Sequence, residues 1–143
     1  MVEAVVDTCV LIGAGLRDSP QRKILEKMEE GELRGIFSEE MFMEVGGHVS
    51  WLWKILKSHS TRGRIIEVVK CGRMVEDVDP VDLIKFLVKD PKDWTFVAVA
   101  MLYEVPVITE DKKHILRNSR ELYDELGIGV FDSEGFLKFQ GWD

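Results

Sequence analysis

The chain has 143 residues, the size of one ordinary domain, and 45% of them are hydrophobic, enough for one core. No apolar run approaches the roughly 18–20 residues that cross a bilayer, and the opening MVEAVVDT lacks the basic region of a signal peptide. Cys9 and Cys71 form no CxxC spacing, which excludes thiolate zinc sites and thioredoxin-like chemistry. We therefore expect a single reduced, cytoplasmic domain over residues 1–143, without a membrane partner.

The net charge of −7 argues by itself against nucleic-acid binding, but the charge is unevenly distributed. Residues 48–73 carry one acidic and six basic side chains: Lys54, Lys57, Arg62, Arg64, Lys70 and Arg73. A basic segment in an acidic chain can hold phosphates beside an acidic site. It can equally be a solvated helix face, and both interpretations stay open.

The first half of the chain reads as strand, helix, strand and helix. Ser19 followed by Pro20 is typical of a helix start, and Ser38 followed by two glutamates is another. The expected elements are a strand over 3–7, a helix from Ser19 to Gly31, a strand over 33–38, and a helix after Ser38 whose apolar stripe reaches Leu56.

The second half continues the alternation of strands and helices. We expect a weak helix over 61–71, an edge strand over 73–78, a helix over 79–87, a buried helix over 93–103, a strand over 105–109, a polar helix over 112–126, a strand over 128–131 and a helical turn over 134–139. The alternation predicts an α/β fold, a three-layer α/β/α sandwich around a mainly parallel sheet of four or five strands.

Four carboxylates stand at the ends of apolar elements: Asp7, Glu44, Asp93 and Asp111. Asp7 and Asp111 follow predicted strands, and Glu44 and Asp93 lie near the start of predicted helices. In parallel α/β folds ligands bind outside the carboxyl ends of the strands, so we expect the four acids at one rim. Clustered carboxylates repel unless a cation compensates them, and hard oxygen ligands select Mg²⁺ or Mn²⁺. Such ions activate water for phosphodiester hydrolysis.

Each of these acids also has a simpler interpretation, as a turn former, a helix cap or an exposed helix acid. Glu40 is the rival of Glu44 on the same helix face, and His48 is a further candidate to line the site. Asp90 is better explained as a cap than as a ligand. Strand alternation should point Glu110 away from Asp111.

The chain resembles the PIN-domain ribonucleases, on the segments VVDTCVLI, SEEMFMEV, KDPKDWTFVAVAMLYEVPVITEDK and FDSEGFLKF. The resemblance implies Asp7, Glu44, Asp93 and Asp111 as catalytic metal ligands for Mg²⁺ or Mn²⁺, with Thr8 and Thr109 in support. It further implies RNA as substrate, and the small size resembles toxins of toxin–antitoxin pairs, with a protein antitoxin and a homodimer. RNA phosphates would meet Lys54, Lys57, Arg62, Arg64 and Lys112.

Two residues depart from the family pattern. Cys9 replaces the usual Asn, although a thiol is a poorer hydrogen-bond partner than an amide, and Trp94 stands where a polar residue is common. Trp94 could instead stack on a base. The leading hypothesis is a metal-dependent endoribonuclease, and the alternative is a catalytically degenerate RNA-binding or scaffold module. A phospho-acceptor receiver domain ranks third, because the strand 33–38 ends in Ser and not Asp.

Overall fold

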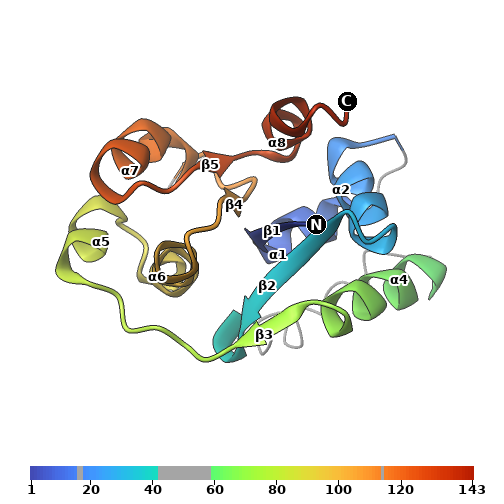
Figure 1. Ribbon diagram of the computed structural model, residues 1–143, viewed down its shortest axis with the longest axis horizontal. Coiled ribbons are helices and arrows are strands. Elements are labelled where there is room, and N and C mark those ends of the chain that lie inside the picture. The colour runs from blue at the N-terminus through green and yellow to red at the C-terminus, as the bar shows by residue number, and fades with distance from the viewer. Residues whose placement is uncertain (16–17, 42–58, 114) are drawn as a thin grey trace.

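The five strands of the described chain form one wholly parallel sheet (Figure 1). The structure is a computed structural model that describes residues 1–15, 18–41, 59–113 and 115–143. The strands are β1 (Val2–Val6), β2 (Leu33–Ser38), β3 (Arg73–Val75), β4 (Val107–Ile108) and β5 (Val130–Phe131). They lie in the order β3-β2-β1-β4-β5, so the carboxyl ends of all five point to the same edge of the sheet.

Helices cover both faces of this sheet, as Figure 1 shows. One layer contains α1 (Thr8–Gly13), α2 (Pro20–Glu29), α4 (His59–Lys70) and α8 (Ser133–Gln140). The other contains α5 (Asp82–Leu87), α6 (Trp94–Tyr103) and α7 (Ser119–Leu126). Short 3₁₀ helices, η1 (Pro91–Asp93) and η2 (Leu116–Asn118), precede α6 and α7. The expected three-layer α/β/α sandwich with a parallel sheet is confirmed.

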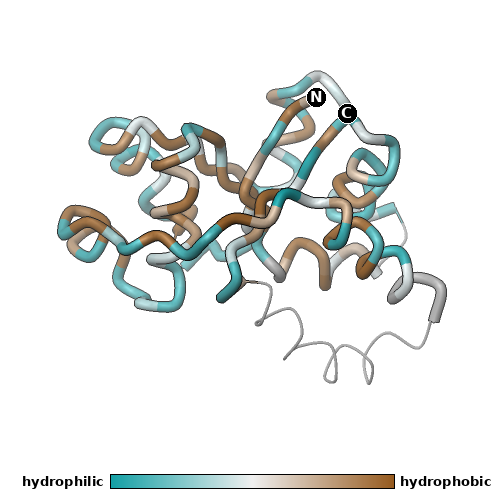
Figure 2. The backbone as a smooth tube through the Cα atoms, turned by 60° about the horizontal axis from the view of Figure 1, so that its bottom comes forward, coloured by the Kyte–Doolittle hydropathy of each residue, from teal (hydrophilic) through white to brown (hydrophobic). Residues whose placement is uncertain are grey.

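The core follows from the apolar segments of the sequence. Helix α6, apolar on every side, buries Phe96 to Ala100 without a break and packs against β1, β2 and β4. Figure 2 shows apolar stretches in both helical layers as well as in the sheet, in keeping with a core on each face. None of the described helices is long and apolar enough to span a membrane.

Most predicted elements are present, and several sequence signals act as expected. Ser19 caps α2 by accepting a hydrogen bond from the Arg22 amide, and Gly127 ends α7 with a φ of 69°. Residues 39–41 are helical, and the Ser38 hydroxyl accepts from the Met41 amide at 3.3 Å. The rest of the helix expected there, residues 42–58, lies outside the described residues.

One helix was not expected from the sequence, and one expected helix begins later than predicted. Helix α1 begins directly after Asp7, in a segment for which no element was expected. The helix expected over 112–126 begins only at Ser119. The preceding stretch forms turns and the short helix η2. The amides of Ile115 and Leu116 both donate to the Asp111 carbonyl, and the Asn118 side chain donates to the Leu87 carbonyl at 3.0 Å.

Candidate functional site

The buried polar side chains of the described chain gather at one edge of the sheet. They are Ser38, Asp93, Thr109 and Ser133. Ser38 ends β2, Thr109 follows β4 directly, and Ser133 opens α8 two residues after β5. Asp93 precedes α6, which runs back to the start of β4 and so begins at this edge as well. Because buried polar groups cost free energy unless they are compensated, their concentration here marks this edge as a candidate site.

Asp7 and Asp111 are joined through Thr109. Asp7 follows β1, and although it occupies the N-cap position of α1, its side chain makes no capping hydrogen bond. The Thr109 hydroxyl donates to Asp7 Oδ2 at 2.7 Å and accepts from the Asp111 amide at 3.1 Å. Thr109 is fully buried, so one hydroxyl fixes the Asp7 carboxylate and the backbone of Asp111.

At this edge, the pKa of the Asp93 carboxyl is clearly shifted. Its side chain makes no capping hydrogen bond to α6, although Asp93 is the N-cap residue. The residue is only 7% exposed, and within the described chain its Oδ2 atom has no hydrogen-bond partner. Burial raises the pKa of Asp93 from 3.8 to about 8, with further contributions from the negative charges of Asp111 and Asp7. Asp7 and Asp111 therefore lie close enough to Asp93 for their charges to oppose its ionisation.

The remaining acid of the expected quartet, Glu44, lies outside the described residues. So do His48, Lys54 and Lys57, and the side chains of Thr8 and Arg62. Glu40, the alternative to Glu44 on the same helix face, lies within the described residues. Its Oε2 accepts a hydrogen bond from the Thr95 hydroxyl at 2.7 Å, and its amide donates to Asp77 Oδ1 at 3.0 Å. Thr95 lies two residues after Asp93, so Glu40 contacts the same helix start.

The two departures from the family pattern have defined contacts. The Cys9 sulfur accepts from the Glu110 amide at 3.3 Å and lies 3.8 Å from the Thr109 hydroxyl. Burial, and then the charge of Asp7, raises the pKa of Cys9 to about 12, so the thiol stays protonated at neutral pH. The Trp94 indole donates to the Val88 carbonyl at 2.6 Å, and Lys85 Nζ lies 5.7 Å from the ring centroid.

Asp90 and Glu110, the two acids that were not expected to be metal ligands, make other contacts. Asp90 caps η1 by accepting from the Lys92 amide at 3.1 Å. Glu110 Oε1 accepts from both the amide and the hydroxyl of Ser133, at the start of α8. Ser133 was not singled out from the sequence. The only signal was the cap Asp132 beside it, which accepts from the Gly135 amide at 2.7 Å.

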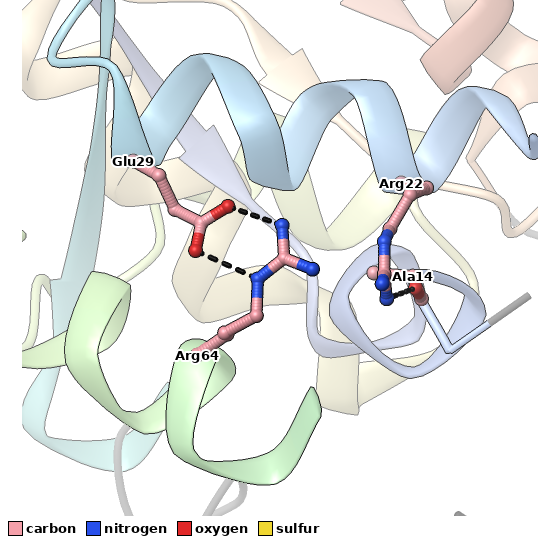
Figure 3. A network of polar contacts seen from close by, with 4 residues as sticks. All are labelled: Ala14, Arg22, Glu29 and Arg64. Carbon is pink, nitrogen blue, oxygen red and sulfur yellow. Dashed lines mark hydrogen bonds and ion pairs between the residues drawn. The ribbon is translucent and has the colours of Figure 1, made fainter. Parts of the chain in front are cut away.

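The basic candidates differ in how they are engaged. Arg64 forms a two-pronged ion pair with Glu29, with nitrogen–oxygen distances of 2.8 and 2.5 Å, and so joins α4 to α2 (Figure 3). On the same helix α2, Arg22 donates to the Ala14 carbonyl at 2.9 Å (Figure 3). Lys112 is exposed and directly follows Asp111. Of the two described side chains, Lys112 is thus the better placed to meet a phosphate near the acids.

The donor chemistry of this edge fits a hard divalent cation. Asp7, Asp93 and Asp111 supply carboxylate oxygens, and the buried Oδ2 of Asp93 lacks a partner among the described residues. In the part of the chain that the structure describes, however, no group of three or more His, Cys, Asp or Glu side chains is arranged to hold a metal ion as it stands. To hold a cation, these three acids would have to move closer together or be joined by a further ligand.

The fold and this edge define the chain as a PIN domain. The PIN-domain family model matches residues 3–113, and the chain belongs to this family, whose members are generally nucleases. The match spans all four candidate acids and ends before α7, β5 and α8.

The fold is also similar to a solved structure, described as the crystal structure of PAE2754 from Pyrobaculum aerophilum. The two superpose with a TM-score of 0.61 at 17% identity, over 99% of this chain and 91% of that chain. At this identity the likeness concerns the fold alone. No curated protein matches the chain in sequence.

Proposed function

We propose that the protein is a metal-dependent endoribonuclease whose cation is held by Asp7, Glu44, Asp93 and Asp111. The observation that carries the proposal is the state of Asp93. A buried carboxyl that faces two more carboxylates, and whose Oδ2 has no partner among the described residues, costs free energy unless a cation compensates it. Asp93 makes no capping hydrogen bond to α6 that would explain it as a structural residue.

Each residue has a task in this proposal. Asp7, Asp93 and Asp111 supply oxygen ligands, and Thr109 holds Asp7 by a hydrogen bond while anchoring the Asp111 amide. Thr8 has a supporting role from the resemblance only. A bound Mg²⁺ or Mn²⁺ would supply an activated water and would stabilise charge on the phosphate. The Cys9 thiol is protonated and acts through its hydrogen bond with the Glu110 amide, not as a ligand.

RNA is the proposed substrate, in a cytoplasmic setting. Lys112 is a described cation next to Asp111, and Lys54, Lys57 and Arg62 remain candidates from the sequence. Arg64 is a weaker candidate because it is paired with Glu29. The resemblance alone supports a toxin role, a protein antitoxin and a homodimer. Light scattering of the purified protein would test the homodimer, and light scattering with the product of the neighbouring gene would test the antitoxin.

The experiment is cleavage of RNA by purified protein in Mn²⁺, comparing wild type with Asp7→Asn and Asp93→Asn. A matched control is Asp124→Asn, which changes an exposed acid on α7. We expect both site variants to lose at least about a hundredfold in rate, which corresponds to about 2.7 kcal/mol of transition-state stabilisation, and the control to keep its activity. Equal cleavage by all four proteins would indicate a contaminant and refute the proposal.

The second candidate function is a catalytically degenerate PIN domain that binds RNA or serves as a scaffold. Cys9 favours it, since the thiol replaces the usual amide beside Asp7. The lack of a ready three-ligand group in the described chain favours it too. Calorimetry with Mn²⁺ separates the two functions, because the nuclease requires saturable binding that Asp93→Asn weakens, whereas the degenerate module shows none.

A further inference from the structure

We propose that Glu110 and Ser133 form a positioning pair that fixes Asp111 from the C-terminal helix α8. Glu110 lies between Thr109 and Asp111, and its Oε1 accepts from the Ser133 amide at 2.9 Å and from the Ser133 hydroxyl. Ser133 is fully buried and is the first residue of α8. The pair joins the segment that follows β4 to an element that begins 22 residues after Asp111.

The chemistry of this contact makes it stronger than an ordinary surface hydrogen bond. A carboxylate that accepts from two donors is held in one orientation, and bonds to an ionised acceptor are stronger than bonds between neutral groups. The contact also places negative charge at the start of α8, where the helix dipole favours it. The cap of α8 is made separately, by Asp132, so Glu110 is not needed as a cap.

The same segment is also held by contacts with α1 and with the end of β1. The Glu110 amide donates to the Cys9 sulfur on α1, and the Thr109 hydroxyl contacts Asp7 after β1. Residues 109–111 are thus attached to β1, α1 and α8 at once. The Asp111 amide donates to the Thr109 hydroxyl two residues earlier, so Glu110 lies within a turn whose side-chain contacts restrict the backbone that carries Asp111.

This pair reaches beyond the part of the chain that the family model matches, which ends at residue 113. Helix α8 would then support the metal ligands and not only close the fold. Groups behind metal ligands orient them, and their loss typically weakens metal binding 10–100-fold. The metal readout of the following test rests on the proposed function, and the exchange readout does not.

The test compares Glu110→Ala and Ser133→Ala with Asp132→Ala. All three variants weaken the start of α8, but Asp132 accepts its hydrogen bond from Gly135 within α8, whereas Glu110 and Ser133 join α8 to the segment 109–111. The first readout is hydrogen exchange of the Glu110 and Asp111 amides in metal-free protein. The second is the affinity for Mn²⁺, measured for each variant. Glu110→Gln, which keeps an oxygen acceptor without the charge, should fall between wild type and Glu110→Ala in both.

We expect Glu110→Ala and Ser133→Ala to exchange these two amides about tenfold faster and to bind Mn²⁺ about tenfold more weakly, with Asp132→Ala close to wild type in both. Equal exchange rates and equal Mn²⁺ affinities in the three variants would mean that the contact between Glu110 and Ser133 only stabilises α8, and would overturn the inference. If wild type bound no Mn²⁺, the proposed function would fail, while the exchange rates would still decide whether the pair fixes the segment.

Discussion

Thr109 donates a hydrogen bond to Asp7 across the ends of two neighbouring parallel strands, with 2.7 Å between Oγ1 and Oδ2. The two residues are 102 positions apart in the chain. The same hydroxyl accepts from the Asp111 amide, so a single buried side chain links the acids that follow β1 and β4. The geometry of the candidate site therefore depends on Thr109 as much as on the acids themselves.

Thr109→Val should separate this role from simple packing, since valine keeps the shape but not the hydroxyl. The Asp7 carboxylate loses a donor and the Asp111 amide loses its acceptor. We expect a loss of about 1–3 kcal/mol in the free energy of unfolding and about tenfold weaker Mn²⁺ binding. Urea denaturation measures the free energy of unfolding, and calorimetry measures the Mn²⁺ affinity. Thr95→Val, which removes the bond to Glu40, is the control, and an unchanged Mn²⁺ affinity in Thr109→Val would refute the role.

The raised pKa of Asp93 predicts how stability depends on pH in metal-free protein. Burial keeps the folded carboxyl protonated up to a pKa of about 8, whereas its ordinary value is 3.8. Between these values the folded state binds the proton and the unfolded state does not, so the contribution of Asp93 to stability falls as pH rises from about 4 to 8. Urea denaturation across this range should show a smaller fall for Asp93→Asn. Identical pH dependence in the two proteins would contradict the shift.

Binding of a divalent cation should be coupled to the same proton. A carboxylate ligand must lose its proton to bind the ion, so Mn²⁺ affinity should rise with pH up to about 8. Calorimetry in buffers of different ionisation enthalpy should detect proton release at pH 7. An affinity that is flat between pH 6 and 8 would mean that Asp93 takes no part.

The ion pair of Arg64 and Glu29 should be structural. Arg64→Ala removes a partly exposed link between α4 and α2, for which we expect a loss of only about 0.2–1 kcal/mol in the free energy of unfolding. RNA affinity should change little, whereas Lys112→Ala should weaken it. Electrophoretic mobility shifts at several salt concentrations measure the RNA affinity of both variants. A larger loss of RNA affinity in Arg64→Ala than in Lys112→Ala would indicate that Arg64 does bind phosphate.

The sequence predicted the layers of the fold because its strands and helices alternate in strong, regular patterns. The apolar run of α6 and the cap at Ser19 are local signals that tertiary contacts do not override. Helix α1 was missed because Thr8 to Gly13 makes no side-chain cap and continues the apolar character of β1. The turns before α7 were missed because the bond from Asn118 to Leu87 is a tertiary contact.

At the candidate site, the parallel topology implied that acids at strand ends should meet. The periodicity of the sequence does not predict which residues hydrogen-bond to the segment that carries these acids. The bond of Glu110 to Ser133 and that of its amide to Cys9 join residues far apart in sequence, at spacings of 23 and 101. Strand alternation predicted only the direction of Glu110, not its partner.

The most direct measurement is a crystal structure of the protein grown with Mn²⁺, in which anomalous scattering locates the ion independently of any assumed ligands. We expect one strong peak in contact with carboxylate oxygens of Asp7, Asp93 and Asp111, with Oδ2 of Asp93 among the ligands. A peak elsewhere on the molecule, or none at a saturating Mn²⁺ concentration, would contradict it.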